Sequence, residues 1–163
     1  MSDERTNRNE QHAAADGPAL LVDIVSDVVC PWCVIGYKHF EQALGAVGAA
    51  ARIRWRAFEL NPDMGPDGED AAEHVARKYG ASAEKHAAAQ AEIAALGAAV
   101  GFTFTPGPSR MRNTFRAHQL LRWAGTLGAK HTVKLALFKA HFTERRNVDD
   151  PVVLTEIAAE AGL

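Results

Sequence analysis

The residues best suited to chemistry are the chain's only two cysteines, Cys30 and Cys33, which enclose Pro31 and Trp32 in a Cys-Pro-Trp-Cys motif. The motif follows a short apolar run and precedes helical periodicity, so we expect it at the start of a helix. There the unpaired N–H groups and the positive end of the helix dipole stabilise a thiolate at the first cysteine. The second cysteine can attack a mixed disulfide formed by the first. The spacing therefore predicts dithiol–disulfide exchange, with Cys30, the outer thiol, as nucleophile and Cys33, shielded in the first turn, as resolving thiol.

Two other interpretations of the cysteine pair are a zinc half-site and an incidental buried pair. Zinc takes four ligands in tetrahedral geometry, and the sequence contains no second Cys-x-x-Cys and no paired histidine motif. Redox chemistry is the favoured interpretation, and it requires neither a metal nor an organic cofactor. Pro31 fits the first helical position because its missing N–H would have no intrahelical partner. Trp32 could shelter the thiol, contact the substrate or simply pack.

The elements that must position the motif are indicated by the apolar pattern. Residues Leu20–Val25 form a nearly continuous apolar run, which is typical of a buried strand with a parallel neighbour. A helix follows the motif and can end at Gly48. Residues Arg52–Ala57 then alternate strictly, which predicts a half-buried strand with three arginines on its solvent face. Strand, helix and strand in this order predict a βαβ unit.

Beyond residue 62 the pattern is helical. A stretch rich in Gly, Pro and Asp (residues 62–70) leads into helices that are placed by their caps and terminating glycines. Ser82, Asn113 and Asp150 are the predicted caps, and Pro151 occupies a first helical position. The expected helices cover residues 71–79, 82–100, 113–127, 130–144 and 150–162.

The composition is that of a globular protein, with 163 residues, 47% of them apolar, and a formal charge of −2. The near-neutral charge gives no electrostatic reason to expect nucleic acid or a membrane as partner, and no apolar run approaches a membrane span. Residues 1–18 are polar and Ala-rich, which predicts a disordered tail and no secretory signal. We therefore expect a cytoplasmic protein, in which a Cys-x-x-Cys pair is more often catalytic or metal-binding than structural.

Two segments resemble the DsbA-like thioredoxin-fold oxidoreductases, in particular the FrnE-type subfamily. The first is Ser26–Cys33, which is followed by Gly36, and the second is Phe58–Pro62. Shorter similarities follow in the same order, at residues 77–80, 113–118, 137–138 and 142–144. The resemblance implies an α/β, incomplete thioredoxin-like fold with an inserted α-helical domain, mostly helical overall. It divides the chain into a βαβ unit (residues 19–62) and a helical insertion domain (residues 63–163).

The resemblance suggests roles for two more residues. Thioredoxin-like enzymes often keep a buried carboxylate behind the second cysteine, and Asp23, which interrupts the first apolar strand, is the candidate proton acceptor. A solvent-facing position is the alternative for Asp23. His118 lies on the apolar side of its helix and is either a core residue or an accessory to the redox chemistry. Asp27, nearer the motif, is expected to cap the turn.

The chain departs from the family pattern near its last residues. Family members continue beyond the position of Gly162 with two antiparallel strands, a loop whose cis-proline faces the motif, and a final helix. No proline follows Pro151 here. We therefore expect a truncated thioredoxin fold whose first strand is an edge with unpaired backbone groups. Such a chain is expected to be weakly stable or to form homo-oligomers through that edge.

The function predicted from the sequence is that of a protein dithiol–disulfide oxidoreductase. It would act on disulfide- or thiol-containing substrates and be recycled by an external thiol system. The first alternative is an activity like that of the 2-hydroxychromene-2-carboxylate isomerases and kappa-type glutathione transferases, which generally activate glutathione with a serine at the position of Cys30. The second alternative is an inactive truncated fragment that needs a partner.

Overall fold

The computed structural model describes residues 19–107 and 109–163, so the predicted disordered tail lies outside the described residues. Helices make up most of the described chain, and the fold is the mostly helical, incomplete thioredoxin-like α/β fold that the sequence predicted. In chain order the elements are β1 (Leu20–Ser26), α1 (Pro31–Val47), β2 (Ala51–Ala57), β3 (Glu69–Asp70), α2 (Ala71–Tyr79), α3 (Ala83–Ala99), β4 (Arg110–Met111), α4 (Phe115–Thr126), α5 (Lys130–Phe142) and α6 (Pro151–Glu160).

The first three elements form the predicted βαβ unit. β1 and β2 pair in parallel, with Ser26 opposite Ala57. α1 connects the two strands and ends at Gly48, as predicted. The left-handed backbone of Gly48 (φ 63°) turns its N–H back onto carbonyls of the last helical turn. Both strands therefore run in the same direction, and the carboxyl end of β1 leads directly into the cysteine motif.

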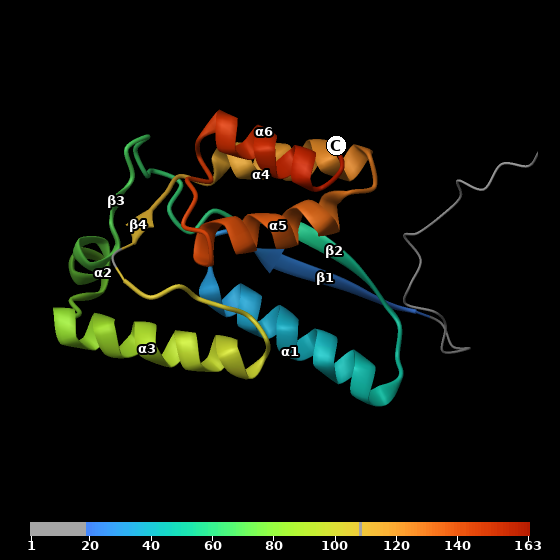
Figure 1. Ribbon diagram of the computed structural model, residues 1–163, viewed down its shortest axis with the longest axis horizontal. Helices are drawn as coiled ribbons and strands as arrows, with labels where there is room; N and C mark the ends of the chain where they lie inside the picture. The colour runs from blue at the N-terminus through green and yellow to red at the C-terminus, as the bar shows by residue number, and fades with distance from the viewer. Residues whose placement is uncertain (1–18, 108) are drawn as a thin grey trace, which may run out of the picture.

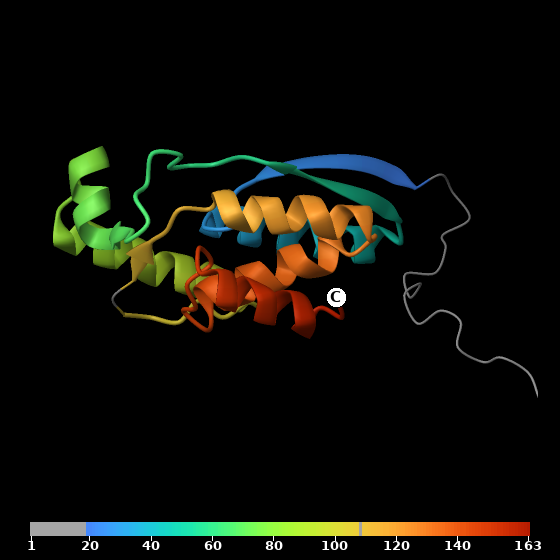
Figure 2. The ribbon, with the colours of Figure 1, turned by 90° about the horizontal axis from the view of Figure 1, so that it is seen from above.

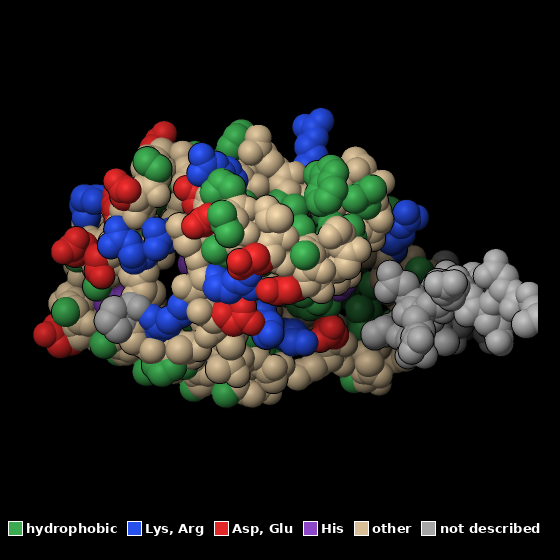
Figure 3. Space-filling model, turned by 45° about the horizontal axis from the view of Figure 1, so that its top comes forward, with side chains coloured by type: hydrophobic (Ala, Val, Ile, Leu, Met, Phe, Trp, Pro, Cys, Tyr) green, Lys and Arg blue, Asp and Glu red, His purple; other side chains and the backbone are tan. Residues whose placement is uncertain are grey.

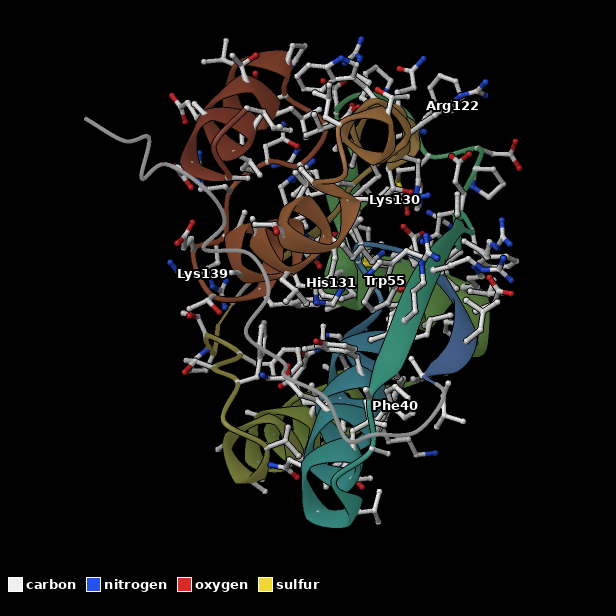
Figure 4. The ribbon with its side chains drawn as sticks, turned by 90° about the vertical axis from the view of Figure 1, so that its right-hand side faces the viewer. Phe40, Trp55, Arg122, Lys130, His131 and Lys139 are labelled. Carbon is white, nitrogen blue, oxygen red and sulfur yellow. The ribbon has the colours of Figure 1, made fainter. Side chains whose placement is uncertain are left out.

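The helices cover one face of this two-stranded sheet and leave the other open (Figure 1 and Figure 4). On β2, Trp55 is buried against α1 and α5, whereas the three arginines of the strand are exposed, as the alternation predicted. On β1, however, Leu21 and Val25 are 57% and 62% exposed. The prediction from the apolar run that β1 is a buried strand is wrong, because no element of the described chain covers the second face of the sheet. The expectation that β1 is an edge strand is confirmed, since within the described chain it pairs with β2 alone.

Two hydrophobic clusters hold the helices to one another and to the βαβ unit. The larger lies between α4, α5 and α6 and includes Val28 and Val29, from the loop between β1 and α1. The smaller joins Tyr37 of α1 and Phe138 of α5 to Trp55 of β2. Because the loop after β1 belongs to the larger cluster and α1 to the smaller, the cysteine motif lies where the two clusters meet.

The predicted helix ends are close to those observed. Ser82 and Asp150 cap α3 and α6 by accepting backbone N–H groups, as predicted. Asn113 precedes the N-cap residue of α4, yet its side-chain oxygen accepts the N–H of Phe115 at 2.9 Å. α5 ends at Phe142, slightly earlier than expected. Local capping signals were therefore sufficient to place the helical elements.

β3 and β4 form a short antiparallel ladder, with Glu69 opposite Met111, that the sequence pattern did not predict. Strands of two residues are too short for an alternating pattern to show. Together with α2 the ladder lies at one end of the molecule, away from α6, and α3 runs back from that end towards α1 (Figure 1 and Figure 2). The domain boundary expected at residue 62 stays a prediction.

Candidate active site

The Cys-Pro-Trp-Cys motif opens α1, as the sequence predicted. Cys30 is the N-cap residue in an extended conformation (φ −96°, ψ 108°), and Pro31 occupies the first turn. The N–H of Cys33 donates to the Cys30 carbonyl oxygen at 3.2 Å. The first turn therefore places both cysteines at the helix N-terminus, where the dipole and the free N–H groups favour negative charge.

The two thiols titrate as a pair. The pKa of Cys33 is lowered to about 6, first because the Cys30 thiol donates a hydrogen bond to it. The Ser26 hydroxyl, the Asp27 N–H and the charge of Lys134 act in the same direction, against the opposing effect of burial. The pKa of Cys30 is raised by the same hydrogen bond and by burial. The pair therefore loses its first proton easily and its second with difficulty, so one stabilised thiolate is present at neutral pH.

The exposure of the motif leaves the pair open to a substrate. Cys30 and Cys33 are both half-buried, so the expected contrast between an outer and a shielded thiol is small. Cys33 packs against the smaller hydrophobic cluster, to which Cys30 does not belong. Trp32 is 55% exposed beside them. Its indole is therefore not simply packed in the core, and its contact with the thiol or with a substrate stays a prediction.

Asp23 does not lie behind the cysteines. Its carboxylate is on the open face of the sheet, where it accepts hydrogen bonds from Arg54 at 2.9 and 2.5 Å and from Arg56 at 2.8 Å. The hydrogen bonds from Arg54 and then Arg56 hold the pKa of Asp23 below its usual range. The role of a buried proton acceptor does not fit this position, since alternation along β1 turns Asp23 to the solvent side. The solvent-facing alternative describes it instead.

Asp27 is the buried carboxylate next to the motif. Its Oδ1 accepts the Val28 N–H and its Oδ2 the Leu60 N–H, each at 2.7 Å. Nε2 of His118 lies 3.2 Å from Oδ1 and 3.0 Å from the carbonyl oxygen of Phe58. Because a carboxylate and a carbonyl only accept hydrogen bonds, Nε2 of His118 carries a proton. Burial alone would raise the pKa of Asp27, but the hydrogen bonds from His118 and the Leu60 N–H keep it below its ordinary value.

The Asp27 carboxylate therefore does more than cap a turn. Its hydrogen bonds connect the loop before Cys30 to Leu60, in the segment after β2, and to His118 of α4. His118 reaches this loop through Asp27, and within the described part of the chain its ring makes no hydrogen bond to either cysteine. Its accessory role in redox chemistry stays a prediction, now with Asp27 as the residue through which it would act.

The family model of the DSBA-like thioredoxin domain matches residues 21–163 of the chain, nearly all of the described part. The chain belongs to this family. Within this DSBA-like chain the match includes β1 except for Leu20, the cysteine motif and all six described helices. The FrnE-type subfamily stays a prediction.

Three similar proteins place the DSBA-like chain among known sequences and structures. The uncharacterised protein YwbO of Bacillus subtilis strain 168 is 29% identical over 142 residues, which are 87% of this chain and 66% of that protein. The crystal structure of a probable DsbA oxidoreductase from Streptomyces coelicolor has a TM-score of 0.82 at 33% identity, covering 88% of this chain and 63% of that one. A putative protein disulfide isomerase from Nitrosomonas europaea has a TM-score of 0.60 at 14% identity, covering 90% and 66%, and supports the fold alone. The DSBA-like chain thus spans about two thirds of the length of these proteins.

The described residues of this DSBA-like chain offer no further zinc ligands for the cysteine pair. Within residues 19–107 and 109–163, no group of three or more His, Cys, Asp or Glu side chains could hold a metal ion. Nor is any helix in this part long and apolar enough to cross a membrane. The face in Figure 3 intersperses Lys and Arg with Asp and Glu, in agreement with the small net charge.

Sequence reasoning missed one residue of this DSBA-like site. Lys134 of α5 is only 1% exposed, and its Nζ lies 3.4 Å from the carbonyl oxygen of Ser26 at the end of β1. The only signal was its place beside Val133 and one turn before Phe138, both buried. A lysine in such a place usually extends its charged end to solvent. Its burial became evident only once β1 and α5 were packed together.

Proposed function

We propose that this chain is a thiol–disulfide oxidoreductase in which Cys30 attacks a substrate disulfide and Cys33 resolves the product. The observation that carries the proposal is the coupled thiol pair at the N-terminus of α1, whose first pKa is lowered to about 6. A free thiol near its ordinary pKa of about 8.5 would be mostly protonated at pH 7. The pair instead holds a thiolate where a substrate can reach it.

The proposed reaction starts from a reduced pair that shares one proton. As Cys30 attacks a substrate disulfide, its proton passes to Cys33, which is its hydrogen-bond partner. A bond forms between Cys30 Sγ and one substrate sulfur, the substrate disulfide breaks, and the departing thiolate takes a proton from water. Cys33 then loses its proton and attacks Cys30 Sγ, which releases the second substrate thiol. The substrate gains two electrons, the cysteines end as a disulfide, and an external thiol restores the reduced pair.

The partners follow from this reaction. The substrates are proteins or small molecules that contain a disulfide or a thiol, and an external thiol system recycles the pair. The proposed location is the cytoplasm. The isomerase and glutathione transferase alternative is less well supported, because a second thiol hydrogen-bonded to the first serves disulfide exchange and has no part in isomerisation. The partner-dependent fragment is the other alternative, and the exposed apolar side chains of β1 are the observation that favours it.

The proposal is tested by equilibrating the chain in glutathione buffers of graded ratio and counting free thiols by mass spectrometry after alkylation. We expect a reversible transition in which two hydrogen atoms are lost together. The Cys33→Ser variant should instead trap a mixed disulfide with a peptide disulfide at Cys30, and the Cys30→Ser variant should trap little. Absence of an intramolecular disulfide at every ratio would overturn the proposal. Aromatic isomerisation without thiol consumption would favour the first alternative.

A further inference from the structure

Lys134 is a cation held inside the protein beside the redox motif. Its side chain is among the largest that are fully buried, and its Nζ lies 4.6 Å from the centre of the Phe138 ring and 5.4 Å from that of Trp55. The Ser26 carbonyl oxygen, at 3.4 Å, is at the long end of hydrogen-bonding distance. Buried lysines are rare unless they are paired, because desolvation disfavours the ammonium form. The position therefore requires a nearby negative charge.

The groups that surround the ammonium identify that charge. Asp27, Cys33 and Cys30 favour the charged form of Lys134, and Lys130, one turn earlier on α5, opposes it. Both oxygens of Asp27 already accept short hydrogen bonds from other donors, as described above. Cys33 packs against the smaller hydrophobic cluster, two rings of which lie next to the Lys134 Nζ, and the charge of Lys134 stabilises the thiolate. The counter-charges of Lys134 are therefore the Asp27 carboxylate, which is present in both redox states, and the thiolate, which only the reduced protein carries.

We propose that Lys134 is a positioning residue for the charge of the cysteine pair. Its buried ammonium stabilises the reduced thiol–thiolate form of the pair and disfavours the disulfide. This inference rests on the proposed redox function and names a residue that sets the reduction potential of the pair. The residue acts on the sulfur atoms through the electric field of its ammonium group, across the interface between α5 and the β1–α1 loop. It makes no bond to the substrate.

The charge balance of the two redox states gives the direction of the effect. In the reduced protein the Lys134 ammonium is stabilised by two negative charges, the Asp27 carboxylate and the thiolate. When the pair is oxidised the S–S bond forms, two electrons leave with the substrate, and the negative charge at sulfur disappears. Lys134 then remains buried without that partner. Burial already lowers the pKa of Lys134 to about 8 in the reduced protein, so oxidation should lower it further and release part of its proton to solvent.

The test compares Lys134→Met, which keeps the length of the side chain and removes its charge, with Lys139→Met. Lys139 is on the same helix but is exposed (Figure 4). It pairs with Glu144 at 2.8 Å. In the reduced protein, thiolate absorbance against pH should show the first thiol midpoint about one unit higher in Lys134→Met. The equilibrium constant for disulfide formation with oxidised glutathione should rise about tenfold, which is a reduction potential about 30 mV more negative. Lys139→Met should match the wild type in both measurements.

Unchanged thiol titration and unchanged glutathione equilibrium in a folded Lys134→Met variant would overturn the inference. If the variant does not fold, NMR titration of the Lys134 side chain decides. Its midpoint should be lower in the Cys30→Ser, Cys33→Ser double variant than in the reduced wild type, and equal midpoints would contradict the pairing. A wild type that never forms the disulfide would refute the proposed function, whereas the titrations of the reduced protein would still test Lys134.

Discussion

The carboxylate of Asp27 and the imidazole of His118 meet in the interior, 3.2 Å apart, although 91 residues separate them in the chain. Asp27 is 1% exposed and lies in the loop that leads from β1 to the cysteines. The contact therefore joins the local βαβ unit to the helices that follow it. The two residues hold in place the backbone from which α1 starts, while the thiols of Cys30 and Cys33 remain partly exposed.

Asp27→Asn should lower the stability of the chain by about 2–4 kcal/mol. The amide side chain of the variant would keep one acceptor oxygen, but its NH2 group would replace the other. That NH2 group would face a hydrogen-bond donor, which is either the Leu60 N–H or the donors that now bind Oδ1. Urea unfolding followed by circular dichroism measures the loss. Asp23→Asn, four residues earlier in the chain and on β1, is the matched control, and because Asp23 is exposed it should change the midpoint little. Equal effects of the two substitutions would contradict the structural role of Asp27.

The same carboxylate should contribute to acid unfolding. The pKa of Asp27 in the folded protein lies below its value in the unfolded chain, which is about 3.9. The unfolded chain therefore binds the proton more readily, so this contribution is fully present above the unfolded pKa and is lost as the pH falls through the folded one. Wild type and Asp27→Asn should differ in free energy of unfolding at pH 6 and converge towards pH 2. A constant difference over this range would contradict the assignment.

Gly97 tests the packing of α3 against the segment that follows it. A Cβ at this position would lie 2.3 Å from Cδ2 of Phe104, so Gly97→Ala should cost about 1–3 kcal/mol. At Gly45 of α1 an added methyl group would have nothing within 4 Å, so Gly45→Ala should stabilise the helix by about 0.5–1 kcal/mol. Thermal unfolding of both variants gives the comparison. Stabilisation by both substitutions would mean that Phe104 does not pack on α3.

Local signals in the sequence predicted the elements of this fold. A glycine in the left-handed region ends α1, and Ser82 and Asp150 cap their helices, because these features depend on a few neighbouring residues. The strict alternation of β2 likewise identified its buried and exposed sides. The family resemblance placed these elements in the DSBA-like fold, which the family match confirms.

Features that depend on distant contacts could not be predicted in this way. Asp23 and Asp27 are close in sequence, and only the packed structure shows that the first faces solvent and the second binds His118. The apolar run of β1 indicated a buried strand, but burial depends on whether another layer covers the second face. Lys134 had no distinguishing pattern, since its environment is made by β1, the motif and α5 together. Self-association through β1 stays a prediction.

The most direct test of the account is the rate of cysteine alkylation against pH, in the native reduced chain and in urea. If the pair at the N-terminus of α1 holds a stabilised thiolate, the native midpoint should lie near 6, whereas the unfolded chain should show the ordinary thiol value of about 8.5. The Cys33→Ala variant serves as the control, since the remaining thiol loses its hydrogen-bond partner and should react with a higher midpoint than the native pair. Coincident midpoints for the native and unfolded chains would contradict the account, because the fold would then give the cysteines no special reactivity.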